Sequence, residues 1–112
     1  TRESTRVALT VMESQIDGGP PLHVHDHEDE SFYVLEGAVT VRCGGDVFEA
    51  GPRRFVFLPR LVPHAFRSVG GPVTLLLIAV PGGIEDYFRD LHQAAGDREI
   101  RRVQAKYGIT AL

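Results

Sequence analysis

The feature that most constrains the fold is a series of short β-prone segments separated by turns rich in glycine and proline. These turns recur about every 8 to 12 residues through most of the chain, which is typical of an all-β sandwich or barrel. The clearest is Gly44-Gly45-Asp46, which predicts a β-hairpin between residues 39–42 and 47–50. The other expected strands are 7–13, 22–27, 31–35, 55–58, 64–69 and 73–80.

The C-terminal part of the chain changes to a helical period. Ile84, Tyr87, Phe88 and Leu91 are spaced i, i+3, i+4, i+7 and form one apolar helical face. We expect Asp97 to cap a second helix that ends at Gly108. The pattern therefore predicts one domain over residues 1–112, with a barrel over about 7–80 and a helical segment over about 83–108.

Composition narrows the classes of partner. The chain has 112 residues, 43% of them hydrophobic, which is enough for one core. Its net charge of −3 argues against nucleic acid and anionic membranes as partners. No apolar run approaches the roughly 18 residues that a membrane span needs. Cys43, the one cysteine, has no partner for an internal disulfide, and the N-terminus lacks an apolar signal segment, so we expect a cytoplasmic location.

Four polar residues stand out against this background. His23 and His25 are two apart, so in a strand both side chains point to the same face. Glu30 follows after a short acidic break, and His64 begins a later strand behind a proline-bounded loop. This pattern predicts a metal site in the mouth of a barrel. The alternative is that the alternating histidines lie on a solvated strand and His64 is an unrelated loop residue.

The same residues resemble the first motif of the cupin family. That motif is His-x-His, three or four residues, Glu, six residues and Gly, and His23, His25, Glu30 and Gly37 match it without a gap. The likeness is to the small single-domain cupins of the quercetin-dioxygenase type. It implies a jelly-roll β-barrel.

The second cupin motif is matched with two departures. Gly51, Pro59 and His64 fit it, whereas Leu61 stands where glycine is usual and Ser68 where asparagine is usual. Glycine at the first of these positions permits positive φ. We therefore expect Leu61 to give this loop a different backbone.

The resemblance implies a site with three histidines and one glutamate, the same four residues that the strand geometry selects: His23, His25, Glu30 and His64. Such donors suit one divalent ion of Fe, Mn, Ni, Cu, Co or Zn and disfavour Ca²⁺ and Mg²⁺. Four protein ligands leave two positions of an octahedral ion open, and anionic substrate oxygens should bind well there. Glu30 would serve as a ligand and as a proton carrier.

Three functions remain open. The first is a metal-dependent enzyme, an oxygenase of dioxygenase type acting on a small organic substrate. The second is a metal-dependent isomerase or lyase that works through an enolate, and the third is a non-catalytic module that binds a small molecule. We also expect a homodimer, because the edge strands of a small barrel tend to pair and small cupins are commonly dimeric.

Other residues receive weaker interpretations. His27 is expected near the rim, as a ligand only if the register slips. His92 is expected on the surface, Cys43 in a structural role, and Arg60 either in solvent or against an anionic substrate. We expect the core or the pocket wall to contain Leu22, Phe32, Val34, Phe57, Phe66 and Leu76.

Overall fold

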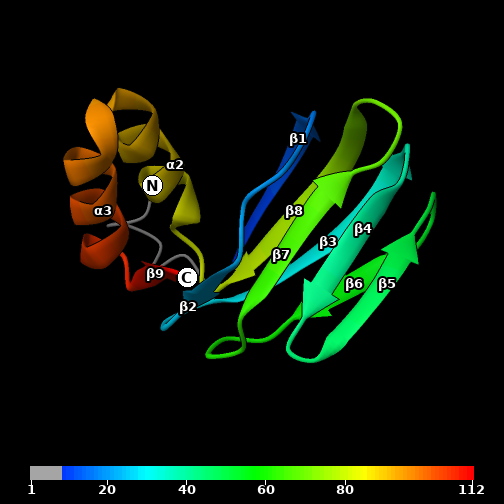
Figure 1. Cartoon of the computed structure of the whole chain (residues 1–112), viewed down its shortest axis with the longest axis horizontal. Helices are drawn as coiled ribbons and strands as arrows, with labels where there is room; N and C mark the ends of the chain where they lie inside the picture. The colour runs from blue at the N-terminus through cyan, green and yellow to red at the C-terminus, as the bar shows by residue number, and fades with distance from the viewer. Residues whose placement is uncertain (1–8) are drawn as a thin grey trace.

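Two antiparallel β-sheets face each other, and a pair of helices lies beside them (Figure 1). The computed structural model describes residues 9–112. The strand order of the first sheet is β1 (Thr10–Ile16), β8 (Val73–Val80), β3 (Asp29–Glu36) and β6 (Phe55–Leu58). The order of the second is β5 (Asp46–Ala50), β4 (Val39–Cys43), β7 (His64–Ser68), β2 (His23–His25) and β9 (Ile109–Ala111). The expected jelly-roll fold is confirmed.

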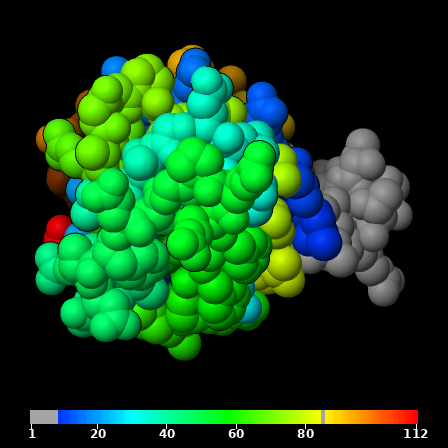
Figure 2. Space-filling view, turned by 90° about the vertical axis from the view of Figure 1, so that its right-hand side faces the viewer, coloured from blue at the N-terminus to red at the C-terminus, as the bar shows by residue number. Residues whose placement is uncertain are grey.

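The core lies between the sheets and follows the two-residue period of the strands. In β8, Val73, Leu75, Leu77 and Ala79 are buried, while the residues between them are more exposed. This strand pairs with β1 on one side and β3 on the other, so its inward side chains occupy the middle of the sheet. The end of the sandwich away from the helices is covered by residues of β5 and β6 (Figure 2).

The predicted hairpin is confirmed. In the β4–β5 pair, Cys43 is opposite Asp46, so Gly44 and Gly45 alone form the turn. Gly44 has a φ of 59°, a conformation that side-chain-bearing residues rarely adopt. The glycine pair therefore sets the register of this hairpin.

Strand boundaries differ from expectation at the N-terminal side. β1 covers Thr10–Ile16 rather than 7–13, and the expected strand residues 7 and 8 lie outside the described part of the chain. β2 covers three residues instead of the predicted 22–27. Its central position between β7 and β9 explains how so short a strand is held.

The first helix, α2 (Ile84–Gln93), matches its prediction. Ile84 and Tyr87 are buried against Ala79 and Ile109, and Phe88 and Leu91 pack against the same cluster. The predicted apolar face is therefore the face that meets the barrel.

The cap predicted for the second helix is wrong. α3 (Gly96–Lys106) has Ala95 at its N-cap, and the Ala95 N–H donates to the Glu99 carboxylate at 3.0 Å. Asp97 lies in the first turn, where a negative charge is favourable toward the helix dipole. Glu99 reaches back to the cap, so the helix starts two residues earlier than expected.

The strand β9 was not predicted. After α3, Gly108 turns the chain with a φ of 72°, and β9 then pairs with β2. The helical segment thus leaves the barrel after β8 and returns beside the histidine strand.

Among residues 9–112, neither helix has the length and apolar character needed to cross a bilayer.

Candidate metal centre

Three histidines meet at one end of the space between the sheets. His23 and His25 lie on β2, and His64, at the start of β7, is directly opposite His23. One ring nitrogen of each lies within 4.8 Å of the others. The ring centroids of His23 and His64 are 4.4 Å apart. The spacing along β2 and the β2–β7 register together produce the cluster.

Backbone carbonyls orient two of these rings. His23 Nδ1 is 2.7 Å from the Pro21 carbonyl oxygen, and His64 Nδ1 is 3.2 Å from that of Val62. A carbonyl oxygen only accepts, so each Nδ1 carries the hydrogen and each Nε2 keeps its lone pair. His64 Nε2 is buried and has no hydrogen-bond partner within residues 9–112. A buried, unpartnered lone pair is what a metal ligand requires.

The electrostatics favour neutral rings. Burial lowers the pKa of His23, and burial together with the neighbouring His23 lowers the pKa of His64 to about 4. At neutral pH both imidazoles are therefore unprotonated and able to donate a lone pair. Three imidazoles with a nearby carboxylate are a donor set that fits a transition metal ion.

Glu30 supplies that carboxylate. It points inward from β3, is 4% exposed, and places Oε2 3.3 Å from His25 Nε2. Burial raises its pKa, with the nearby His25 acting in the opposite direction. The structure therefore brings all four sequence-predicted site residues to the same end of the barrel, with Glu30 beside His25.

The loop before His64 is tied to the histidine strand. The Leu61 N–H donates to the His25 carbonyl at 2.8 Å, and Leu61 has a φ of 66°. The expectation that leucine here would change the loop backbone is wrong, because Leu61 itself adopts the positive φ usual for glycine. The other departure, Ser68, accepts a hydrogen bond from the Gly18 N–H through its hydroxyl at 2.6 Å.

Arg60 does not take part in the site. Its guanidinium contacts the two Asp29 carboxylate oxygens at 3.3 and 3.1 Å, and its backbone N–H donates to one of them at 2.8 Å. These contacts hold the pKa of Asp29 below its usual range. The pair fastens the loop to the start of β3, and a substrate contact of Arg60 finds no support in this arrangement.

A cavity of about 550 Å³ opens beside the histidines, between the sheets and the helices. Of the predicted wall residues, Phe66 lines it. Phe32 and Val34 lie deeper in the core, while Phe57 is 54% exposed on the outer face. The cavity is lined by Met12, Ser14, Gln15, Ile16, Pro20, Pro21, His23, His25, Glu30, Phe66, Leu75, Leu77, Tyr87, Phe88, Leu91, Gln104, Ile109 and Ala111. The expectation that Leu22, Phe57 and Leu76 belong to the core or the pocket wall is wrong, because they lie neither among the buried core residues nor in this lining.

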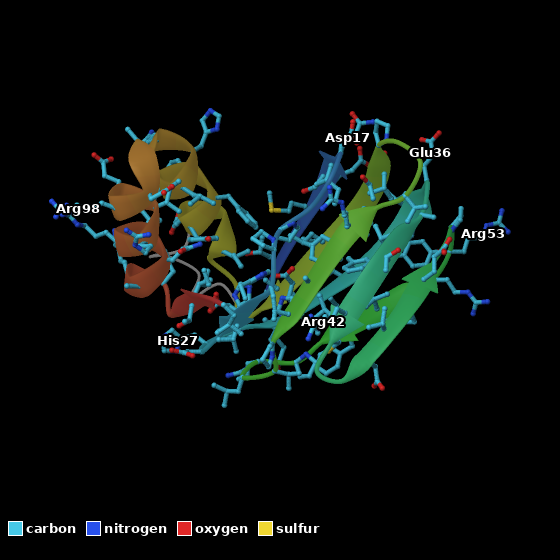
Figure 3. All side chains as sticks on the ribbon, viewed as in Figure 1. Asp17, His27, Glu36, Arg42, Arg53 and Arg98 are labelled. Atoms are coloured by element: carbon cyan, nitrogen blue, oxygen red, sulfur yellow. The ribbon has the colours of Figure 1, made fainter. Side chains whose placement is uncertain are left out.

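The remaining histidines and the cysteine lie outside the cluster. His27 is exposed near the C-terminal strand (Figure 3), where a side chain at position 108 would collide with its ring. His92 is exposed. Cys43 is a half-buried free thiol whose pKa is raised by burial, so it has no feature of an activated nucleophile.

Two features near the site were not predicted. Tyr87, Phe88 and Leu91 belong to the predicted apolar face of α2, but their place with Gln104 in the wall of the cavity was not foreseen. Glu28 is 8% exposed, with Oε1 3.5 Å from His25 Nδ1. An acidic residue in a strand break reads as solvent-exposed, so no local signal marked it.

A family model described as a cupin domain matches residues 10–79 of the chain. The chain is a cupin. Its sequence is 32% identical over 69 residues to quercetin 2,3-dioxygenase of Bacillus subtilis (strain 168). The match covers 62% of this cupin but 20% of that relative, so the chain spans a fifth of the relative's length.

Solved structures agree with this assignment. TT1209 from Thermus thermophilus superposes with a TM-score of 0.56 and 31% identity, over 67% of this chain and 70% of that one. KdgF from Halomonas sp. superposes with a TM-score of 0.64 and 20% identity, over 70% and 74% of the two chains. The second likeness concerns the fold alone.

Proposed function

We propose that His23, His25, Glu30 and His64 hold one divalent transition metal ion, of Fe, Mn, Ni, Cu, Co or Zn. The proposal rests on three ring nitrogens within 4.8 Å of one another and on the Glu30 carboxylate 3.3 Å from His25. The unpartnered Nε2 of His64 supports it, because buried polar atoms normally have a partner.

We propose further that this cupin is a metal-dependent enzyme of dioxygenase type acting on a small organic substrate. The observation that carries the proposal is that His23 and His25 of the cluster, together with Glu30, line an apolar cavity, the common form of a small-molecule site. When bound, an ion of this set polarises a substrate oxygen and, if redox-active, activates dioxygen. A closed structural site would lack such a cavity.

The side chains around the cavity would have different roles in the reaction. The three histidines hold the ion, and the lowered pKa values of His23 and His64 keep the lone pairs of these two rings available. Glu30 would be a ligand of the ion, and its carboxylate is also the group placed to accept a proton from the substrate. Phe66, Tyr87 and Phe88 keep water away from the bound substrate.

The residues that line the cavity also indicate the kind of substrate that would bind there. Among the described residues that form the cavity wall there is no lysine or arginine, and the residues with polar side chains other than the histidines and Glu30 are Ser14, Gln15, Tyr87 and Gln104. We therefore propose a largely apolar substrate with an anionic oxygen, such as an enolate or phenolate, at the metal end. A phosphorylated substrate would find no cation to meet it.

The test is to load the metal-free protein separately with Fe²⁺, Mn²⁺, Ni²⁺, Cu²⁺ and Zn²⁺ and to offer flavonols, diketones and small enolisable acids. We expect oxygen uptake coupled to substrate loss, abolished in His64→Ala and retained in His27→Ala. Substrate loss without oxygen uptake would favour an isomerase or lyase. Binding without turnover over the whole panel would favour a non-catalytic module.

We also propose that the protein is a homodimer in the cytoplasm. The outer face of the β1-β8-β3-β6 sheet carries exposed apolar side chains, including Val11, Phe55 and Phe57. Association through this face would cover them and the adjacent edge strands. Light scattering at micromolar concentration should give twice the chain mass, and a monomer mass would contradict it.

The free thiol of Cys43 suits a reducing compartment, which supports the proposed cytoplasmic location.

A further inference from the structure

His25 differs from the other two histidines in having a carboxylate at each ring nitrogen. Its Nε2 is 3.3 Å from Glu30 Oε2, and its Nδ1 is 3.5 Å from Glu28 Oε1. The Nδ1 atoms of His23 and His64 face backbone carbonyls instead. The ring of His25 thus has Glu30 on the cavity side and Glu28 behind it.

Glu28 lies beside a ring nitrogen of His25 that has no hydrogen-bond partner among the described residues. His25 is 2% exposed, and its Nδ1 has no hydrogen-bond partner within residues 9–112, since the 3.5 Å contact with Glu28 is longer than an ordinary hydrogen bond. Glu28 is itself 8% exposed, and no lysine or arginine among the described residues lies within ion-pair distance of it. A buried carboxylate with no lysine or arginine within ion-pair distance, placed beside an unpartnered imidazole nitrogen, can accept a hydrogen bond from that nitrogen.

We propose that Glu28 is a positioning residue of the metal site. It accepts the hydrogen on His25 Nδ1 and thereby keeps the Nε2 lone pair free for the ion that Glu30 would also bind; this inference rests on the proposed metal site. A carboxylate in this place does more than a carbonyl, because its charge makes the opposite ring nitrogen a stronger donor. Glu28 does not itself line the cavity beside the histidines, so its action passes through His25.

The surroundings of Glu28 should allow it to be replaced without a large loss of stability. It also borders a second, polar cavity of about 540 Å³ together with His27, Asp86 and Tyr107. Removing the carboxylate therefore leaves a space that water can fill rather than a void in the apolar core. Exposed His27, the residue before it, provides a matched control on the same loop.

The experiment measures Co²⁺ and Zn²⁺ affinity by competition with a chromogenic chelator, in wild type, Glu28→Ala, Glu28→Gln and His27→Ala. We expect Glu28→Ala to weaken affinity by about 10–100-fold. Glu28→Gln, whose amide oxygen still accepts a hydrogen bond, should recover part of this loss, and His27→Ala should change little. The visible absorption of bound Co²⁺ should shift in Glu28→Ala, because a misdirected His25 alters the ligand field.

Two outcomes overturn the proposal in different ways. If wild type binds one ion and Glu28→Ala binds it equally well with an unchanged Co²⁺ spectrum, Glu28 has no positioning role and the metal site stands. If wild type binds neither ion, the proposed metal site fails and the role of Glu28 fails with it. Should Glu28→Ala not fold, Glu28→Leu, whose side chain cannot accept a hydrogen bond, takes its place, and wild-type affinity and spectrum in that variant would refute the proposal.

Discussion

The two ends of the barrel interior are built from the same strands with opposite chemistry. On β3, Glu30 faces inward at one end, and Phe32 and Val34 face inward at the other. On β7, His64 is followed by Phe66 on the same face. One step of two residues along each strand therefore changes the interior from polar to apolar.

The difference shows how stability and chemistry are kept apart in so small a protein. At the apolar end, Phe32 and Val34 are fully buried in the core cluster. At the polar end, His25 and His64 each have a buried ring nitrogen without a partner among the described residues, next to a cavity. Packing at the first end holds the sheets in register, and this register places the histidines at the second.

The largest effect on stability should come from the apolar end. Phe32→Ala should lower the free energy of unfolding by about 3–5 kcal/mol, because it leaves a cavity among fully buried side chains. Metal affinity of the molecules that remain folded should change only a few-fold. Chemical denaturation of the metal-free protein and chelator competition measure the two quantities.

Phe57→Ala is the matched control, since Phe57 sits on the neighbouring strand but is 54% exposed. Phe57→Ala should lower the free energy of unfolding much less than Phe32→Ala does. Equal losses for the two phenylalanine variants would show that the apolar end does not carry the stability assigned to it.

A smaller effect on stability should be shared by the two loops that contain a non-glycine residue with positive φ. Leu61, with a φ of 66°, lies in the loop at the polar end, and Arg53, with a φ of 71°, lies in a turn at the apolar end, where its N–H donates to Val34. Leu61→Gly and Arg53→Gly should each raise the free energy of unfolding by about 1 kcal/mol through relief of the left-handed conformation.

Both glycine variants should keep wild-type metal affinity, because the Leu61 N–H bond to His25 needs only the backbone. Denaturation and chelator competition again provide the measurements. A fall in stability for Leu61→Gly alone would mean that the leucine side chain, rather than the backbone, holds the loop.

The smallest effect on stability should come from a hydrogen bond between the two helices, outside the barrel. The Tyr107 hydroxyl donates to the Asp90 carboxylate at 2.5 Å and joins the two helices. This bond holds the pKa of Asp90 below its ordinary value. The same hydrogen bond, with burial as a smaller cause, raises the pKa of Tyr107 to about 12. Tyr107→Phe should lower the melting temperature slightly at pH 7.

The pH dependence of that small difference has a definite sign. A depressed carboxyl pKa contributes stability above its unfolded value, and the contribution is lost as pH falls through the folded value. The gap between wild type and Tyr107→Phe should therefore close in acid, as thermal unfolding from pH 7 down to about pH 3 would show. A gap that widens in acid would contradict the hydrogen bond.

Much of this architecture was predictable because it depends on local periods. The Gly44-Gly45 hairpin, the apolar face of α2 and the spacing of His23, His25 and Glu30 are all contained in short segments. The contact of His64 with the others is long-range, and it was predicted through the resemblance and the start of its strand.

Other features depend on contacts that no short segment contains. Residues 55–58 are apolar on both faces, so the alternation did not say that Phe57 points outward and Leu58 inward. β9 forms because β2 offers it a free edge, and Leu61 adopts a positive φ because its N–H is bound to His25. Glu28 is buried by the fold as a whole.

The most direct test of the account is the metal content of protein purified without a nickel resin and then supplemented with Fe²⁺, Mn²⁺, Ni²⁺, Cu²⁺, Co²⁺ or Zn²⁺. Elemental analysis should find about one ion per chain in wild type and in His27→Ala, and close to none in His64→Ala, because loss of a ligand breaks the coordination. A stoichiometry near zero in wild type, or undiminished metal in His64→Ala, would contradict the assignment of His23, His25, Glu30 and His64 as the metal centre.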